Sequence, residues 1–241
     1  MDHGLTEGPI KGIDRDLGDM VNKVALGGAN AVLGHIGIPL YAHRGYGPDI
    51  GLILHLSGST SLSPESNYKV LVNDVLEAVK LGADGVSLHI NIGTKSDPEM
   101  LEILGKVSRE CREFGMPLIA MMYPRGENVE DEHDAKVVKI AARVAAELGA
   151  DIVKTNWTGD PDSFKEVVDG CMAPVIIAGG VKAGIKDHLE ITKQSIDVCG
   201  AGVAYGRNVF QAENPRKVVK ALYLIVHENY GVNEAINELR L

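Results

Sequence analysis

Cysteine is scarce in this 241-residue sequence, which holds only Cys111, Cys171 and Cys199. The number is odd and no CxxC spacing occurs, which argues against a disulfide framework and against a paired-cysteine metal motif. Sparse, separated cysteines are typical of proteins that keep reduced thiols in a cytoplasm. We therefore expect a cytoplasmic protein with three buried, unreactive thiols.

Long apolar runs and blocks of like charge are also missing. No run approaches the ~18 apolar residues that a transmembrane helix requires, and the first residues do not resemble a signal peptide. The formal net charge is -9 with acids and bases interspersed, so neither nucleic acid nor a membrane is an expected partner. Aromatic residues make up 5% of the chain against 45% hydrophobic residues, which predicts an aliphatic core.

One pattern occurs four times: a helical segment, then Gly-Ala or Gly-Gly-Ala, then a short apolar run. Glycine can end each helix in the left-handed conformation, and the run that follows is a candidate strand. The four instances are VALGGANAVLGH, VKLGADGVSLHI, AAELGADIVKT and DVCGAGVAYG. Further apolar runs are GLILHL, PLIAMMY and APVIIAGG, and MDHG at residues 1–4 reads as the exit of one more strand.

These runs are apolar almost throughout, as in parallel strands that are buried on both faces. Amphipathic helical segments such as DAKVVKIAARVAAELG separate them. Regular alternation of strand and helix over this length predicts an α/β fold, a (β/α)8 TIM barrel whose first strand is truncated at the N-terminus. Residues 1–241 would form a single domain, and an open doubly wound sheet is the alternative.

Lys154 ends the apolar strand segment DIVKT. Catalytic residues of such barrels lie at the carboxyl ends of the strands, so this position is a candidate for chemistry. Loss of hydration would lower the pKa of a buried amine and free it to attack a carbonyl group. The alternative is an amine that pairs with a carboxylate or reaches the rim of the barrel.

Tyr123 ends the preceding strand and opens the segment YPRG, which places its phenol beside Lys154. A phenol in that position can transfer protons to and from an imine-forming substrate, although it can also be a core aromatic residue. Pro124 and Arg125 follow, and the guanidinium group could hold a substrate oxyanion or lie in solvent.

The last two strand segments, IIAGGVK and AYGRNVF, end in Gly179-Gly180 and Gly206-Arg207. Backbone N–H groups exposed by glycine, together with a helix N-terminus and an arginine, form a phosphate-binding site. The loops after strands seven and eight are its usual place in a (β/α)8 TIM barrel. Two such loops together predict a phosphorylated substrate.

Asp2 could act as the base on a substrate hydroxyl, or it could cap the following turn. Three histidines at strand ends, His35, His55 and His89, could in principle form a zinc site. They come from different strands and no HxH or HExxH spacing occurs, so packing or substrate contacts is the favoured interpretation. The scheme built on Lys154 needs neither metal nor cofactor.

The segments MDHGLTEGPIKGI, HRGYGPDIGLILHLSGSTSLSP, PLIAMMYPRG, DIVKTNWTGD, VIIAGGVK and GVAYGRNVFQ, in that order, resemble the archaeal-type class I aldolases across essentially the whole chain. HRGYG and HLSG point to the synthase branch of this family, and its fructose-bisphosphate aldolases are the runner-up. The resemblance implies a Schiff base at Lys154, with Tyr123 as proton donor and Asp2 as base. It further implies substrate binding by the following residues: His3, Gly4, Leu5, Thr6, Pro124, Arg125, Gly179, Gly180, Gly206 and Arg207.

The reaction implied by the resemblance is an aldol transfer. A ketose 1-phosphate such as 6-deoxy-5-ketofructose 1-phosphate would give a three-carbon fragment to aspartate semialdehyde, on an alternative route to 3-dehydroquinate and aromatic amino acids. Relatives form rings of barrels, which implies a homo-oligomer such as a decamer. Three other functions stay open: a fructose-bisphosphate aldolase, a histidine-bound metal aldolase or isomerase, and a catalytically silent barrel that binds sugar phosphates.

Overall fold

A computed structural model describes residues 1–42, 49–180 and 184–240 of the chain. Seven strands form one parallel sheet in the order β1-β2-β5-β6-β7-β8-β9. Their bounds are β1 Ala31–Gly34, β2 Gly51–His55, β5 Gly85–Ile92, β6 Leu118–Pro124, β7 Ile152–Thr155, β8 Val175–Ala178 and β9 Gly202–Ala204. A short antiparallel pair, β3 Ser57–Gly58 with β4 Val70–Leu71, lies between β2 and β5 in the sequence.

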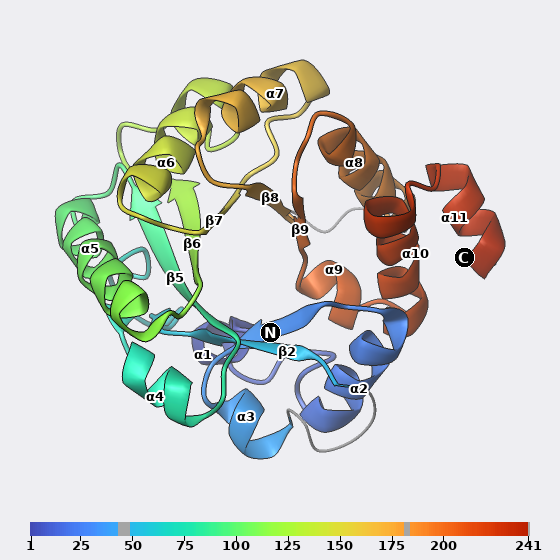
Figure 1. The fold of residues 1–241 in the computed structure, drawn as a ribbon, viewed down its shortest axis with the longest axis horizontal. Coiled ribbons are helices and arrows are strands. Elements are labelled where there is room, and N and C mark those ends of the chain that lie inside the picture. The colour runs from blue at the N-terminus through green and yellow to red at the C-terminus, as the bar shows by residue number, and fades with distance from the viewer. Residues whose placement is uncertain (43–48, 181–183, 241) are drawn as a thin grey trace.

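Helices surround the curled sheet on its outer side (Figure 1). Their bounds are α1 His3–Glu7, α2 Leu17–Gly27, α3 Gly37–Tyr41, α4 Val75–Lys80, α5 Asp97–Phe114, α6 Ala135–Glu147, α7 Pro161–Gly170, α8 Ile185–Asp197, α9 Arg207–Phe210, α10 Pro215–Glu228 and α11 Val232–Leu239. The alternation of strands with outer helices confirms the predicted α/β barrel-type fold, and the doubly wound alternative is wrong.

The segment at residues 1–7 lies between the two ends of the sheet, since no ladder joins β9 to β1 within the described residues. The N-terminal ammonium group of Met1 donates to the carbonyl oxygen of Leu33 on β1, and the ring of His3 packs edge-on against Phe210, with centroids 5.5 Å apart. MDHG is nevertheless not a strand: the backbone is helical from His3, and Gly8 N–H donates to Gly4 at 3.0 Å. The prediction of a strand exit is corrected to a helical turn.

Left-handed residues end the helices before β1, β5 and β7, as the repeated pattern predicts. Gly28, Gly82 and Gly149 have φ of 98°, 68° and 87°. In the fourth instance, Cys199 takes the left-handed conformation at φ 68° instead of Gly200. A methyl group at Gly200 would lie 2.2 Å from Oγ of Ser195, so this glycine is required for close packing and not for its φ.

Side chains along the strands alternate between two environments, although the sequence runs are almost wholly apolar. Outward-facing residues such as Leu54, Leu88 and Val153 are fully buried against the helices, and each leucine stabilises the fold by roughly 1.5–3 kcal/mol. Inward-facing positions on β2 and β5 carry the buried polar residues His55, Ser87 and Asn91. The core therefore lies outside the sheet, and its inside is free for chemistry.

Two expectations about the surface have different outcomes. No helix of the described residues is long and apolar enough to cross a membrane. All three cysteines are free, and Cys111 is buried, with burial raising the pKa of its thiol to about 12. Cys171 is half-buried and Cys199 is exposed, so the prediction of three buried thiols is wrong for these two.

Candidate active site

The register of β5, β6 and β7 brings one row of side chains together inside the barrel. Met121 pairs with His89 on one side and with Lys154 on the other, and Tyr123 pairs with Asn91. Because successive side chains of a strand alternate between its faces, Met121 and Tyr123 point to the same side. That side also holds Lys154, and the predicted neighbourhood of lysine and tyrosine is confirmed.

The amine of Lys154 lies 3.7 Å from Sδ of Met121, and the Tyr123 phenol is close enough to raise the pKa of this amine. Burial lowers the pKa of this amine, but the Tyr123 phenol and the Asp2 carboxylate together raise it by more. The pKa of Lys154 therefore lies above its ordinary value. The predicted lowering is wrong for this state of the protein, because the sequence could not show how closely the two anion-forming groups approach. Without substrate, the amine is an ammonium.

Asp2 precedes α1, and its carboxylate lies 3.3 Å from Nδ1 of His3. Burial raises the pKa of this carboxyl group, but the adjacent His3 ring and the charges of the Met1 amine, His55 and Lys154 hold it well below its usual range. At neutral pH the group is therefore an anion within electrostatic range of the Lys154 ammonium. The Asp2 carboxylate is therefore unprotonated and can act as a base inside the barrel.

Three histidines surround this pair. His35 Nδ1 is 3.1 Å from the carbonyl oxygen of His55, His55 Nδ1 is 2.7 Å from Oγ of Ser87, and His89 Nε2 is 2.9 Å from Oδ1 of Asn91. Burial lowers the pKa of all three rings, that of His55 to about 3, so they are neutral at pH 7. Among the described residues no three His, Cys, Asp or Glu side chains are grouped to hold a metal ion.

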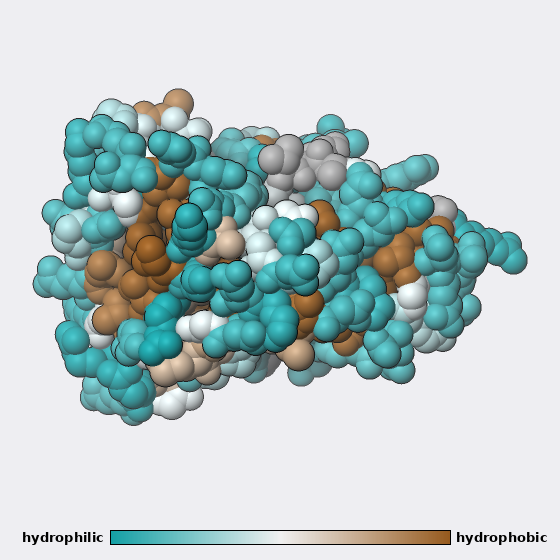
Figure 2. Space-filling view, turned by 90° about the horizontal axis from the view of Figure 1, so that it is seen from above, coloured by the Kyte–Doolittle hydropathy of each residue, from teal (hydrophilic) through white to brown (hydrophobic). Residues whose placement is uncertain are grey.

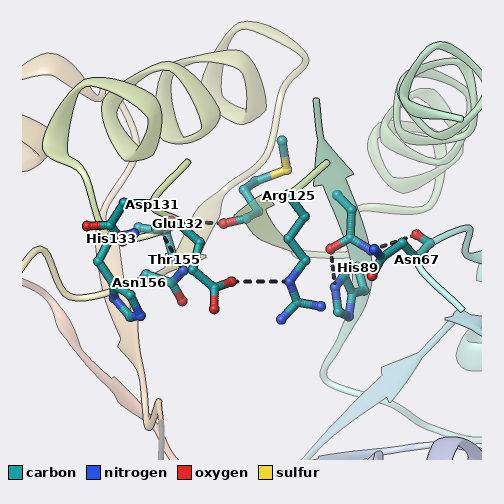
Figure 3. Close-up of polar contacts among 10 residues, drawn as sticks. Asn67, His89, Arg125, Asp131, Glu132, His133, Thr155 and Asn156 are labelled. Atoms are coloured by element: carbon teal, nitrogen blue, oxygen red, sulfur yellow. Dashed lines mark hydrogen bonds and ion pairs between the residues drawn. The ribbon is translucent and has the colours of Figure 1, made fainter. Parts of the chain in front are cut away.

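Arg125 lies across the open end of β6. Its guanidinium group is 5.2 Å from the ring centroid of Tyr123, and its Nε donates to Glu132 at 3.3 Å. Figure 3 shows Arg125 between Glu132 on one side and His89 on the other. The guanidinium group therefore lies at the mouth of the barrel, above the tyrosine, and not in open solvent.

Glu132 belongs to a loop that the sequence did not single out. Asn156 Nδ2 donates to the carbonyl oxygen of Glu132 at 3.0 Å, and His133 Nδ1 is 2.8 Å from the carbonyl oxygen of Trp157. These bonds fasten the loop after β6 to the residues that follow Lys154, and Figure 3 shows Asn156 beside Glu132. No spacing rule could identify them, because they join two irregular segments 24 residues apart.

The glycine loops after β8 and β9 lie side by side, as predicted. Asn208 Nδ2 donates to the carbonyl oxygen of Gly179 at 2.8 Å, which links the two loops. Gly180 has φ of 58°, and a methyl group at Gly206 would lie 2.6 Å from Cε1 of His3. These contacts bring α1 and both glycine loops to one edge of the barrel. Residues 181–183, which complete the segment IIAGGVK, lie outside the described residues, as do residues 43–48 with HRGYG.

The Arg207 side chain points elsewhere. It lies 3.5 Å from Glu7, about half exposed, and it lines a cavity of about 600 Å³ with His188 and Tyr205 that contains neither Lys154 nor Tyr123. Leu5 and Thr6 also contact protein: the Leu5 side chain abuts Gly58, and the carbonyl oxygen of Thr6 accepts from Ser61 at 2.8 Å. For these three residues the described contacts are structural.

Comparisons with known proteins agree with this geometry. The family model described as "DeoC/LacD family aldolase" matches residues 1–212. The chain is 42% identical to 2-amino-3,7-dideoxy-D-threo-hept-6-ulosonate synthase 1 of Archaeoglobus fulgidus, over 98% of this chain and 87% of that protein. It is 34% identical to 2-amino-4,5-dihydroxy-6-oxo-7-(phosphonooxy)heptanoate synthase of Streptomyces griseus, over 95% and 84%.

Among solved structures, an archaeal fructose 1,6-bisphosphate aldolase matches with a TM-score of 0.87 and 33% identity, over 95% of this chain and 92% of that one. A Schiff-base-forming fructose-1,6-bisphosphate aldolase, studied through its reaction intermediates, matches with the same TM-score and identity, over 94% and 92%.

Proposed function

The chain belongs to the DeoC/LacD family of aldolases and is an enzyme of the Schiff-base class, and we propose that Lys154 is its nucleophile. The single observation that carries the proposal is that Lys154 and Tyr123 meet inside the barrel on the adjacent strands β7 and β6, with the Asp2 anion in electrostatic range. A lysine, a phenol and a carboxylate are the three groups that imine-based carbon–carbon cleavage requires.

The first step is loss of the extra proton from the Lys154 ammonium, whose pKa is raised. Entry of a ketone displaces water from the barrel, which lowers the pKa of the Lys154 ammonium. A base then accepts the proton of this ammonium. The free amine then adds to the ketone carbon, and Tyr123 donates a proton to the carbinolamine oxygen, which leaves as water. The product is an iminium at Lys154, a cation that accepts the electron pair of a breaking carbon–carbon bond.

Asp2 acts in the second step as the base. It takes the proton of the hydroxyl group beside the breaking bond, the hydroxyl carbon becomes a carbonyl, and the bond's electrons form an enamine on Lys154. The enamine carbon adds to the aldehyde of an acceptor, and hydrolysis of the new iminium releases the product. The lowered pKa of Asp2 keeps it unprotonated at neutral pH, ready for this role.

We propose 6-deoxy-5-ketofructose 1-phosphate as donor and aspartate semialdehyde as acceptor, giving 2-amino-3,7-dideoxy-D-threo-hept-6-ulosonate for aromatic amino acid biosynthesis. Two curated relatives named for this product, from Archaeoglobus fulgidus and Halobacterium salinarum, are each 42% identical to the chain. Cleavage of fructose 1,6-bisphosphate is the second candidate, because the matching solved structures at 33% identity are of such aldolases.

The substrate is held, in this proposal, by groups that converge on the mouth of the barrel. The two glycine loops supply backbone N–H groups for the phosphate, and Arg125 contributes a cation above Tyr123. The complete set is His3, Gly4, Leu5, Thr6, Pro124, Arg125, Gly179, Gly180, Gly206 and Arg207. Leu5, Thr6 and Arg207 would have to act through backbone groups or after rearrangement, given their present contacts.

We also propose a single cytoplasmic domain that assembles as a homo-oligomer such as a decamer. The support is an apolar groove of about 770 Å³ on the outside of α5 and α6, lined by Leu101, Ile140, Val144 and Leu148. Ile140 is 56% exposed, and Figure 2 shows apolar side chains gathered on one part of that face. Exposed apolar surface of this kind is typical of contacts between subunits.

Parallel assays test the choice of substrate. The purified protein is incubated with the ketose 1-phosphate and aspartate semialdehyde, and separately with fructose 1,6-bisphosphate, with Lys154→Met as the inactive control. Heptulosonate formation with a kcat/KM at least tenfold above that for bisphosphate cleavage supports the synthase. The reverse ratio selects the fructose-bisphosphate aldolase, and binding of phosphorylated ketose without turnover selects the silent barrel.

A further inference from the structure

Lys69 is a buried cation that the mechanism above does not use. Its residue is 7% exposed, and it lies in the segment that joins β3 to β4. The ammonium donates to Oγ of Ser59 at 2.5 Å and to the carbonyl oxygen of Ser66 at 2.7 Å. No carboxylate of the described residues forms an ion pair with it, which is unusual for a buried lysine. An ammonium has three N–H groups, so one remains for a ligand.

The loop that carries Lys69 is bonded to the inner face of β5. Asn91 Nδ2 donates to the carbonyl oxygen of Asn67 at 2.6 Å, and the backbone N–H of His89 donates to Oγ of Ser57 at 2.9 Å. Figure 3 shows Asn67 and His89 on the side of Arg125 that faces away from Glu132. These bonds place the loop at the barrel mouth, next to the guanidinium group.

Electrostatic interactions agree with this placement. Burial lowers the pKa of Lys69, Arg125 lowers it further, and Asp2 raises it. His89 in turn is affected by both Lys69 and Arg125. These interactions agree with a Lys69 ammonium near Arg125 at the barrel mouth. Two cations placed there can bind an anion.

We propose that Lys69, with Arg125, binds the carboxylate of the acceptor aldehyde and so selects acceptors that carry a carboxylate group. Glu132 already neutralises Arg125, so the pair presents a single uncompensated positive charge, which matches a carboxylate better than a doubly charged phosphate. The glycine loops that suit phosphate lie near α1 and β8, on other strands of the barrel. This inference rests on the proposed aldolase function and deepens it by naming the acceptor class.

The test separates acceptor binding from donor chemistry. Lys69→Met, Lys69→Arg and wild type are assayed with aspartate semialdehyde, with glyceraldehyde 3-phosphate and with uncharged glycolaldehyde. Lys95→Met is the matched control, since Lys95 is 86% exposed and paired with Glu127 at 3.2 Å. We expect Lys69→Met to raise the KM for aspartate semialdehyde at least tenfold while the KM for glycolaldehyde changes less than twofold, and Lys69→Arg to restore most of the affinity.

Reaction with the donor is measured separately. Each variant is incubated with the ketose 1-phosphate without acceptor and treated with borohydride, and the amount of covalently trapped donor is measured. Trapping equal to wild type shows that Lys69→Met is folded and forms the Schiff base. Equal KM changes for charged and uncharged aldehydes would overturn the proposal, as would a change confined to glyceraldehyde 3-phosphate, which would indicate a phosphate site. Failure of wild type itself to trap the donor would instead refute the proposed function.

Discussion

Met121 and Lys154 are register partners on adjacent parallel strands, and Sδ of Met121 lies 3.7 Å from the amine of Lys154. A thioether is a weak hydrogen-bond acceptor, so this neighbour does not stabilise the ammonium as a carboxylate would. The charge is held instead by Tyr123 and Asp2, the two groups assigned to proton transfer. Removal of either group changes the chemistry and the protonation state of the nucleophile together.

Tyr123→Phe removes the phenol but keeps the ring that packs edge-on against His89, with centroids 4.9 Å apart. We expect iminium formation in single-turnover experiments to slow by 10²- to 10⁴-fold, the usual contribution of a positioned proton donor. Stability should change by about 1 kcal/mol or less, because only the hydroxyl group is lost and the ring packing stays. An unchanged rate would show that another group, or water, supplies the proton.

His55 predicts how stability depends on pH. Its folded-state pKa is lowered to about 3, below the unfolded value near 6.5, so the unfolded chain binds more protons between these values. The stabilisation that neutral His55 contributes is fully present above pH 6.5 and is lost as the pH falls toward 3. The free energy of unfolding then falls by up to about 1.4 kcal/mol per pH unit.

Urea unfolding at pH 7, 6, 5 and 4 measures this slope. His55→Gln should flatten the acid limb of the curve, because glutamine does not titrate, even if stability at pH 7 falls. His227→Gln, at an exposed helix position, is the matched control and should leave the slope as in wild type. Equal slopes in all three proteins would contradict a neutral, buried His55.

Gly206→Ala tests how α1 is positioned. The added methyl group would lie 2.6 Å from Cε1 of His3 and would push α1, with Asp2 before it, away from β9. We expect kcat to fall at least tenfold while the unfolding free energy falls by only about 1–3 kcal/mol, the usual cost of overpacking. Gly37→Ala is the control, since nothing lies within 4 Å of a methyl group there.

Apolar runs and their helix-ending glycines were enough to predict the strands, the outer helices and the row of Lys154 and Tyr123. These features depend on local spacing, which a sequence shows directly. The pKa direction of Lys154, the helical turn at His3 and the left-handed Cys199 depend on which groups meet through space, and the predictions from the sequence were wrong for all three.

Lys69 and Glu132 were missed for a related reason. Both lie in irregular segments that follow strands, where no periodicity marks a functional side chain. Their position at the barrel mouth follows from bonds such as Asn91 to Asn67 and Asn156 to Glu132, each between residues 24 positions apart. Contacts between two such irregular segments leave no pattern in the sequence, so only the three-dimensional structure reveals them.

The most direct measurement is the site of covalent trapping. The protein is incubated with the ketose 1-phosphate, reduced with borohydride and digested, and peptide masses locate the adduct. We predict one adduct per chain, on Lys154, absent from Lys154→Met and present on Lys69→Met. An adduct on another lysine, or catalytic turnover of the ketose by Lys154→Met, would contradict the account.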